Sequence, residues 1–163
     1  MEMVTLDRAE TKIIAVKEEN EKKKRYLRQY QKHARRISRI DAEIEEIRML
    51  KLSPALKMGD GMPKGSNQND LSDFAANIDR MEQELYNEGI ELVKSYNRIS
   101  YRIKQLPDRN ESDVLFYKYI KDMNFWEIAK VMGYSERHIT RIHGNALSHL
   151  KLPKDVLECP SNL

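Results

Sequence analysis

The sequence has a single cysteine, Cys159, and no long apolar run. One cysteine has no partner in the chain, which excludes an internal disulfide framework and favours a reducing compartment. No segment approaches the roughly 20 consecutive apolar residues that a membrane span requires. The N-terminus also has no basic segment followed by an apolar run, as a secretory signal would. We therefore expect a cytoplasmic protein with no membrane partner.

Motifs of common catalytic chemistry are absent as well. The sequence has no Ser-His-Asp order, no Cys-His pairing of known spacing and no glycine loop followed by Lys-Ser or Lys-Thr. His138, His143 and His149 are separated by five and six residues, which places them on different faces of a helix. A helical metal site needs ligands at i and i+4. We predict no enzymatic activity, no metal site and no cofactor.

Charge is concentrated near the N-terminus, although the formal net charge is only +3. Nine Lys or Arg residues and no acidic residue lie between Lys22 and Arg39. Such a block either follows a phosphate backbone or forms a solvated helix face, and the sequence leaves both interpretations open. The candidate accessory phosphate contacts are Lys22, Lys23, Lys24, Arg25, Arg28, Lys32, Arg35, Arg36 and Arg39.

Hydrophobic periodicity predicts two long helices joined by a linker. Apolar residues from Leu27 to Ile47 alternate at spacings of three and four, which predicts a basic amphipathic helix over residues 22–51. Residues 1–21 form an N-terminal extension that is either a separate short helix or a continuation of the long one. Residues 52–69 contain two prolines and three glycines, which predicts a flexible linker.

The second long helix is predicted over residues 70–106. Its apolar stripe has coiled-coil-like spacing, with a slip in phase between Leu85 and Tyr96, close to Gly89. Two such helices can bury their stripes only against each other or against another copy of the chain. We therefore expect a homo-oligomer, either a dimer or a higher assembly.

The segment 107–152 has the local signals of a helix-turn-helix. Asn110, followed by Asp113, predicts the start of a helix, and Asn124 with Glu127 forms a capping-box pattern at the start of the next. Gly133 stands where the tight turn requires a positive φ. Phe125 and Trp126 are expected to pack within the module, with a partner-anchoring role as the alternative. Residues 153–163 form a tail.

A third helix, capped by Ser135, is the predicted recognition helix. Its inward side carries Ile139, Ile142, Ala146, Leu147 and Leu150, and its outward side begins at Glu136. Recognition helices place their first two turns against base edges, where Arg suits guanine and Glu suits cytosine. The predicted base-reading residues are Glu136, Arg137 and Arg141. The predicted contacts to the DNA backbone, which position without specifying, are Ser135, His138, Thr140 and Lys151.

These residues also carry a family resemblance. The stretch LPDRNESDVLFYKYIKDMNFWEIAKVMGYSERHITRIHGNALSHL resembles the promoter-binding fourth region of bacterial sigma factors. The layout from Lys22 to Leu150 is similar to small regulators from phages and prophages of Gram-positive bacteria, in the style of the RinA and ArpU late-gene regulators. The fold class expected is all-α: two long coiled-coil-like helices, a flexible linker and a C-terminal helix-turn-helix of the sigma region 4 type.

The resemblance implies a sequence-specific transcriptional regulator that binds double-stranded DNA, is encoded by a phage or prophage and acts on late or packaging genes. RNA polymerase is a further expected partner. The sigma regions for promoter melting and core-polymerase docking are absent, so a complete sigma factor is not implied. The alternative is a sigma-like adaptor that docks on RNA polymerase or on a packaging complex resembling a small terminase, with weak DNA binding.

Overall fold

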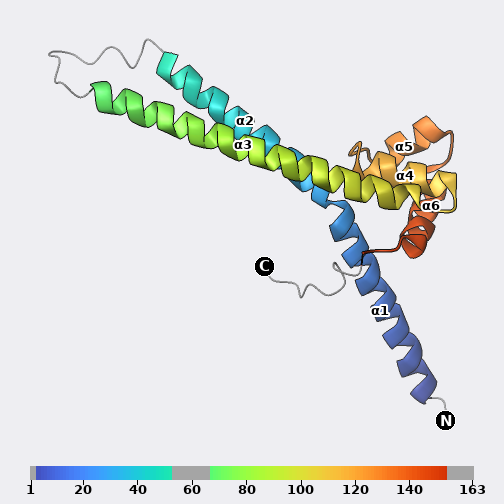
Figure 1. The fold of residues 1–163 in the computed structure, drawn as a ribbon. Coiled ribbons are helices and arrows are strands. Elements are labelled where there is room, and N and C mark those ends of the chain that lie inside the picture. The colour runs from blue at the N-terminus through green and yellow to red at the C-terminus, as the bar shows by residue number, and fades with distance from the viewer. Residues whose placement is uncertain (1–2, 53–66, 154–163) are drawn as a thin grey trace. The chain divides into compact units, whose positions relative to one another are not determined.

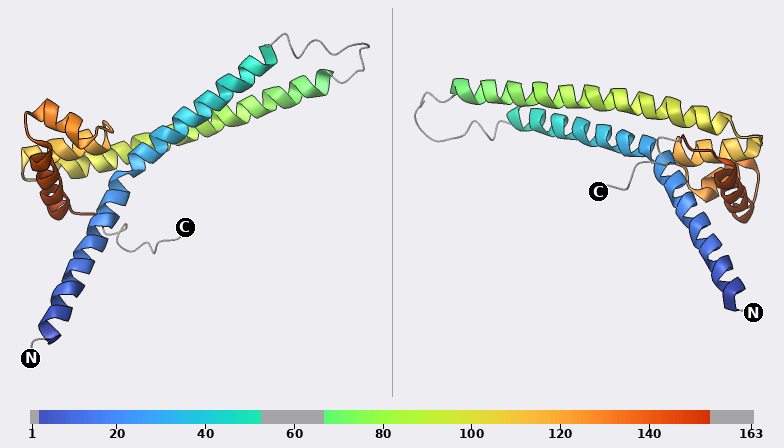
Figure 2. Two further views of the ribbon diagram at one scale, coloured as in Figure 1. Left: turned by 180° about the vertical axis from the view of Figure 1, so that it is seen from behind. Right: turned by 60° about the horizontal axis from the view of Figure 1, so that its bottom comes forward.

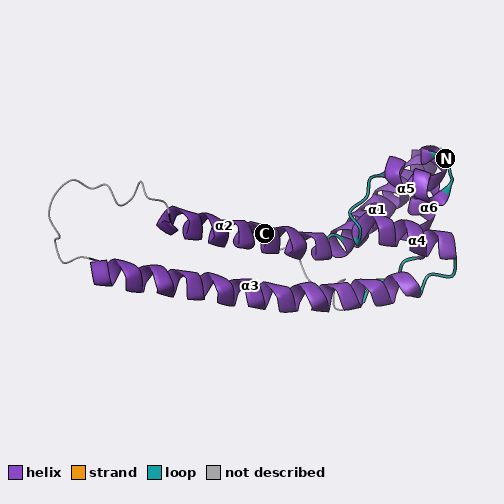
Figure 3. Ribbon diagram, turned by 90° about the horizontal axis from the view of Figure 1, so that it is seen from above, coloured by secondary structure: helices purple, strands orange, loops and turns teal. Residues whose placement is uncertain are grey.

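The computed structural model describes residues 3–52 and 67–153, and these residues form six α-helices and no strand (Figure 3). The expected all-α fold class is confirmed. Residues 53–66, most of the predicted linker, and residues 154–163 of the predicted tail lie outside the described residues. Among the described helices, none is both long and apolar enough to span a membrane. The helices are α1 (Met3–Leu27), α2 (Gln29–Leu52), α3 (Asn67–Lys104), α4 (Arg109–Tyr119), α5 (Phe125–Met132) and α6 (Glu136–His149).

The structure differs from the single helix expected over residues 22–51. Helix α1 starts at Met3 and runs through most of the predicted N-terminal extension, and it ends at Leu27. Helix α2 begins at Gln29, so the break falls at Arg28, whose N–H still donates to the carbonyl of Lys24 at 3.0 Å. No glycine or proline marks this position, which is why the sequence pattern did not show it.

The chain divides into two compact units. We call residues 32–94 the hairpin unit and residues 1–31 with 95–163 the core unit. In the hairpin unit, α2 and α3 run side by side in opposite directions (Figures 1 and 2). Ile40 and Ile44 are buried there. Arg36 pairs with Glu84 at 2.9 Å and Arg48 with Glu82 at 2.6 Å, and these ion pairs join the two helices along their length.

The expected slip in phase along α3 does not occur. Half-buried and buried positions continue at spacings of three and four from Leu85 through Glu88, Leu92 and Ser95 to Ile99. Two of these positions carry polar side chains, so a search for apolar residues alone loses the stripe. Ser95 is 1% exposed, whereas Tyr96, which the apolar pattern selected, is 39% exposed. The heptad spacing of these positions is therefore continuous along α3, and only the polarity of the side chains that occupy them changes.

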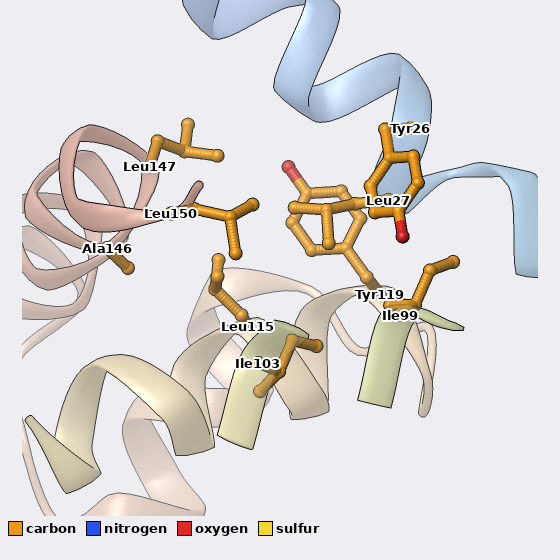
Figure 4. Close-up of a cluster of buried hydrophobic side chains, with 9 residues drawn as sticks. All are labelled: Tyr26, Leu27, Ile99, Ile103, Leu115, Tyr119, Ala146, Leu147 and Leu150. Carbon is orange, nitrogen blue, oxygen red and sulfur yellow. The ribbon is translucent and has the colours of Figure 1, made fainter. Parts of the chain in front are cut away.

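The core unit is built around a cluster to which four helices contribute (Figure 4). Leu27 of α1 is fully buried in this cluster and Tyr26 nearly so. Burying a leucine or isoleucine side chain contributes roughly 1.5–3 kcal/mol, so this cluster fixes the helices that carry the C-terminal module. The remaining members are Ile99 and Ile103 of α3, Leu115 and Tyr119 of α4, and Ala146, Leu147 and Leu150 around the end of α6.

A second cluster holds α4, α5 and the first half of α6 together. Val114, Ile128 and Ile139 are fully buried at its centre, with Ala129 and Ile142 beside them. Ala129 is small where α5 and α6 meet, which lets the two backbones approach closely. The inward side of α6 is thus fixed along its whole length, by the second cluster at its start and by the first cluster at its end.

Candidate nucleic-acid interface

The start of α5 is set by a complete capping box, as the sequence predicts. The N–H of Glu127 donates to Oδ1 of Asn124 at 2.9 Å, and the N–H of Asn124 donates to Oε2 of Glu127 at 2.7 Å. Two backbone donors that the helix leaves unpaired are therefore satisfied. The helix before it differs slightly from the prediction, because α4 is capped by Asp108 rather than by Asn110: Oδ1 of Asp108 accepts from the N–H of Asn110 at 2.8 Å.

The turn between α5 and α6 depends on the backbone of Gly133. Its φ is +71° and its ψ is 28°, in the left-handed region, and its N–H donates to the carbonyl of Ala129. A Cβ placed on Gly133 would meet no atom within 4 Å. Glycine is therefore needed here for its conformation and not for space. The position and the reason both agree with the sequence prediction.

Ser135 begins α6 by accepting the N–H of His138 at 3.3 Å through its side-chain oxygen. The predicted inward residues of α6 are all buried. Its predicted outward residues are exposed, apart from His138, which is half-buried. The exposed members are Ser135, Glu136, Arg137, Thr140 and Arg141, and Lys151 after the end of the helix is exposed too.

A shallow hollow of about 490 Å³ lies on this outward face. Nη2 of Arg141 lies 3.0 Å from Nδ1 of His138. Because a guanidinium only donates, Nδ1 of His138 accepts, and this fixes its ring with the proton on Nε2. The hydroxyl of Thr140 donates to the carbonyl of Glu136 at 3.0 Å and keeps its lone pairs free. The residues lining the hollow are Ser135, Arg137, His138, Thr140 and Arg141.

Arg137 and Arg141 are available to a ligand. Neither forms an ion pair with any side chain that the structure describes. They are one helical turn apart on the same face, and their guanidinium groups are suited to two-pronged recognition of phosphate or guanine. The structure brings together five of the seven predicted DNA-contacting residues in one hollow and keeps Glu136 on the same exposed turn.

Sequence reasoning missed one aromatic side chain at this face. Tyr134 is 41% exposed and its ring centroid lies 4.8 Å from that of His138. Its ring therefore packs against the imidazole that accepts from Arg141. A tyrosine directly before the capping serine was the available signal.

The two aromatic residues at the start of α5 behave differently from each other. Phe125 packs against the second cluster, as expected. The packing expectation is wrong for Trp126, which is 55% exposed and has Nζ of Lys130 3.5 Å from its ring centroid. Val131 on the same helix is exposed as well. The outer part of α5 thus exposes two apolar side chains, one of which has the ammonium of Lys130 over its ring.

His143 is a buried polar residue that the sequence pattern did not reveal. Its Nε2 shares a hydrogen bond with the hydroxyl of Tyr119 at 3.0 Å, and the edge of Phe125 lies against its ring with centroids 5.1 Å apart. Burial, with smaller contributions from Lys24, Lys118 and Arg28, lowers the pKa of His143 to about 4. Burial likewise raises the pKa of Tyr119 to about 12. The pair is therefore neutral near pH 7 and belongs to the core. No group of three potential metal ligands occurs among the described residues.

The structure divides the basic block between Lys22 and Arg39. Lys23 is buried, pairs with Glu19 at 2.7 Å and donates to the carbonyl of Ser148 at 3.5 Å. Three others form ion pairs: Lys24 with Glu21, Arg36 with Glu84 and Glu88, and Arg39 with Glu43. The remaining members are exposed and form no ion pair with a described side chain. They are Lys22, Arg25, Arg28, Lys32 and Arg35.

Residues 102–152 match the family model described as Sigma-70, region 4. No curated protein and no solved structure matches the chain significantly. The matched segment contains α4, α5 and α6 together with the end of α3, which is the part whose capping, turn and exposed face are described above. Region 4 is a DNA-binding helix-turn-helix region. This C-terminal module is therefore of the sigma region 4 type, and the chain carries a DNA-binding helix-turn-helix.

Proposed function

We propose that this chain is a sequence-specific DNA-binding transcriptional regulator. The observation that carries the proposal is the outward face of α6, where Arg137 and Arg141 are exposed and form no ion pair with a described side chain, while the inward face is buried. A helix held on one side and basic on the other fits the major groove, which admits an α-helix. The positive end of the helix dipole adds to this, because it lies at Ser135, where a phosphate would be favoured.

Each residue of this face has a proposed role. Arg137 and Arg141 read base edges, and His138 holds the guanidinium of Arg141 in place through the hydrogen bond between them. Glu136, in the first turn of α6, reads a base by accepting from the amino group of cytosine, or orients a neighbouring base-reading side chain. Ser135, His138, Thr140 and Lys151 contact the DNA backbone.

The test is selection of bound duplexes from a random pool by the full-length protein, followed by affinity measurements on the selected site. We expect the double variant Arg137→Ala/Arg141→Ala to lose the selected sequence preference and at least about 2 kcal/mol of binding free energy. The matched control is Arg80→Ala, because Arg80 is an exposed arginine in the hairpin unit. Unchanged affinity in the double variant would contradict the assignment of the face.

The free members of the basic block are proposed as accessory phosphate contacts. Lys22, Arg25 and Arg28 belong to the core unit, which also carries the helix-turn-helix. Each phosphate contact that is removed lowers the dependence of binding on salt by about one unit in the log-log slope. Arg25→Gln should therefore reduce the slope and leave the sequence preference intact, whereas Lys23→Gln should act on stability, since Lys23 is already engaged within the protein.

We further propose that the chain is encoded by a phage or prophage, acts on late or packaging genes and meets RNA polymerase at its promoter. The similarity of the layout to small phage regulators supports the first two points, and the sigma region 4 match supports the third. Footprinting with and without RNA polymerase on the selected site is the direct measurement. An extension of the footprint over the promoter in the presence of polymerase is expected.

A second candidate function is that of an adaptor that docks on RNA polymerase or on a packaging complex and binds DNA weakly. The exposed Trp126 and Val131 on α5 favour it, because exposed apolar side chains on a module of this size suit a protein partner. In this case Trp126→Ala would abolish copurification with polymerase subunits or terminase, and the random pool would yield no preferred duplex.

The chain is also proposed to form a homo-oligomer, a dimer or higher. Ile13, Ile14 and Val16 of α1 are all more than half exposed, and an apolar group of this kind on a helix is suited to a second copy. Sedimentation of the wild type and of Ile13→Glu at micromolar concentration tests it. A monomer in both proteins would contradict the proposal.

A further inference from the structure

The core unit contains a second hollow, at the opposite end of α6 from Arg137 and Arg141. It has a volume of about 570 Å³, within the range of about 300–1,000 Å³ typical of small-molecule sites. It shares no lining residue with the hollow that holds Arg137 and Arg141. We propose that it binds a small organic anion of mononucleotide size, with a phosphate or carboxylate carried on an aromatic body.

The walls of this hollow come from the end of α3 and the end of α6. Helix α3 contributes Tyr101, Arg102 and Gln105, and the segment after it contributes an apolar patch at Leu106 and Pro107. Tyr101 is 60% exposed, and the guanidinium of Arg102 lies over its ring at 5.8 Å from the centroid, so an aromatic surface and a cation are adjacent in this hollow. The lining therefore combines aromatic and aliphatic side chains with polar and charged ones.

The charges that line the hollow are of one sign. Arg102 and Lys151 form no ion pair with any side chain in the described part of the chain, and none of the described residues that line the hollow is a carboxylate. Two acids lie next to the lining residues: Asp108 directly follows Pro107, and the buried Glu111 accepts from Nδ1 of His149 at 2.8 Å. Neither acid forms an ion pair with Arg102 or Lys151 in the described part of the chain, and a hollow lined by cations concentrates anions.

The combination of walls selects the class of ligand. Inorganic phosphate would pair with Arg102 and Lys151 but would leave the apolar lining residues in contact with water. A neutral aromatic ring would pack on Tyr101 but would leave the two cations without an anion. A ligand with a ring and an anion satisfies both, and Gln105 and Ser148 offer hydrogen bonds between the two ends. A mononucleotide has this construction.

The experiment is isothermal titration of the full-length protein with adenosine monophosphate, adenosine and inorganic phosphate in parallel. We expect adenosine monophosphate to bind at least about tenfold more tightly than either fragment. Arg102→Gln should weaken it by about tenfold or more, and Tyr101→Ala should weaken the nucleotide without changing the weak binding of phosphate. The matched control Lys121→Gln, an exposed cation elsewhere in the core unit, should bind as the wild type does.

The DNA assay separates this site from the proposed function. Arg102→Gln should retain the selected duplex and lose the nucleotide, and Arg137→Ala/Arg141→Ala should do the reverse. No heat at millimolar adenosine monophosphate would overturn the proposal, as would equal binding by wild type and Arg102→Gln. Binding of an acidic peptide in place of all three probes would overturn it too, since the site would then be a protein-docking surface.

Discussion

The buried imidazole of His143 makes the stability of the core unit depend on pH in a defined window. Its ordinary pKa of 6.5 is lowered to about 4 in the fold by burial and by the nearby cations Lys24, Lys118 and Arg28. Above pH 6.5 the imidazole is neutral in both the folded and the unfolded chain. Between pH 6.5 and about 4 the imidazole is protonated in the unfolded chain and stays neutral in the folded chain, so the free energy of unfolding falls as the pH falls.

The size of the effect follows from the two pKa values. At about 1.4 kcal/mol for each unit of pKa, the full difference amounts to about 3 kcal/mol. About 2 kcal/mol of this is already lost at pH 5, before the folded imidazole itself begins to protonate. A domain of this kind has a total stability of about 5–15 kcal/mol, so the loss should be easily measured.

The assay is urea unfolding followed by the fluorescence of Trp126, the single tryptophan, which lies in the core unit. The comparison protein is His143→Gln, which can keep a hydrogen bond to Tyr119 and does not titrate. Protonation of carboxylates lowers the free energy of unfolding of both proteins as the pH falls. Only the difference between the two curves therefore reports on His143. Parallel curves between pH 7 and 5 would refute the reasoning, and so would a histidine NMR titration giving an ordinary pKa in the folded wild type.

Three further predictions concern the turn, the caps and the hairpin. Gly133→Ala should lower the free energy of unfolding by about 1–2 kcal/mol, because alanine is strained at the positive φ of this position. The control is Gly144→Ala, at a mid-helix glycine with equal free space, which should raise the free energy of unfolding by up to about 1 kcal/mol. A fall in both variants would contradict the conformational argument. Asn124→Ala should cost about 1 kcal/mol in urea unfolding, because it removes the acceptor of the capping box, and no change would show that the box does not stabilise α5. Glu88→Gln should weaken the protection of backbone amides in α2 and α3 against hydrogen exchange, since Glu88 pairs with both His33 and Arg36 and is nearly buried. Glu84→Gln removes an exposed ion pair and should have a much smaller effect. Equal effects of the two variants would count against the role of burial.

The helix-turn-helix could be predicted from the sequence because its signals are local. Asn124 and Glu127 are three residues apart, and Gly133 and Ser135 determine the turn and the next cap through their own backbone and side-chain chemistry. The inward face of α6 followed from spacing alone. Each of these features depends on neighbours within one or two helical turns, which is the range that a sequence pattern covers.

The features that were missed depend on contacts between distant residues. The break at Arg28 adjoins Leu27, which is buried in a cluster with side chains of α3, α4 and α6 that are distant in the sequence. Ser95 and Glu88 occupy buried positions on α3 although they are polar, and Glu88 does so because His33 and Arg36 on α2 supply its partners. In the sequence, His143 stands out only as a candidate metal ligand, whereas its burial involves Tyr119 and Phe125, which belong to two other helices.

The contact between α1 and α6 also has a consequence for synthesis on the ribosome. Lys23 and Ser148, which are joined by a hydrogen bond, are 125 positions apart, and Tyr26 and Leu27 emerge long before the helix that covers them. A nascent chain must therefore keep these apolar side chains unburied until α6 has been synthesised, and closing so large a loop is slow compared with forming a helix. Truncated products released early would lack a finished core around the DNA-reading helix and would be substrates for proteolysis.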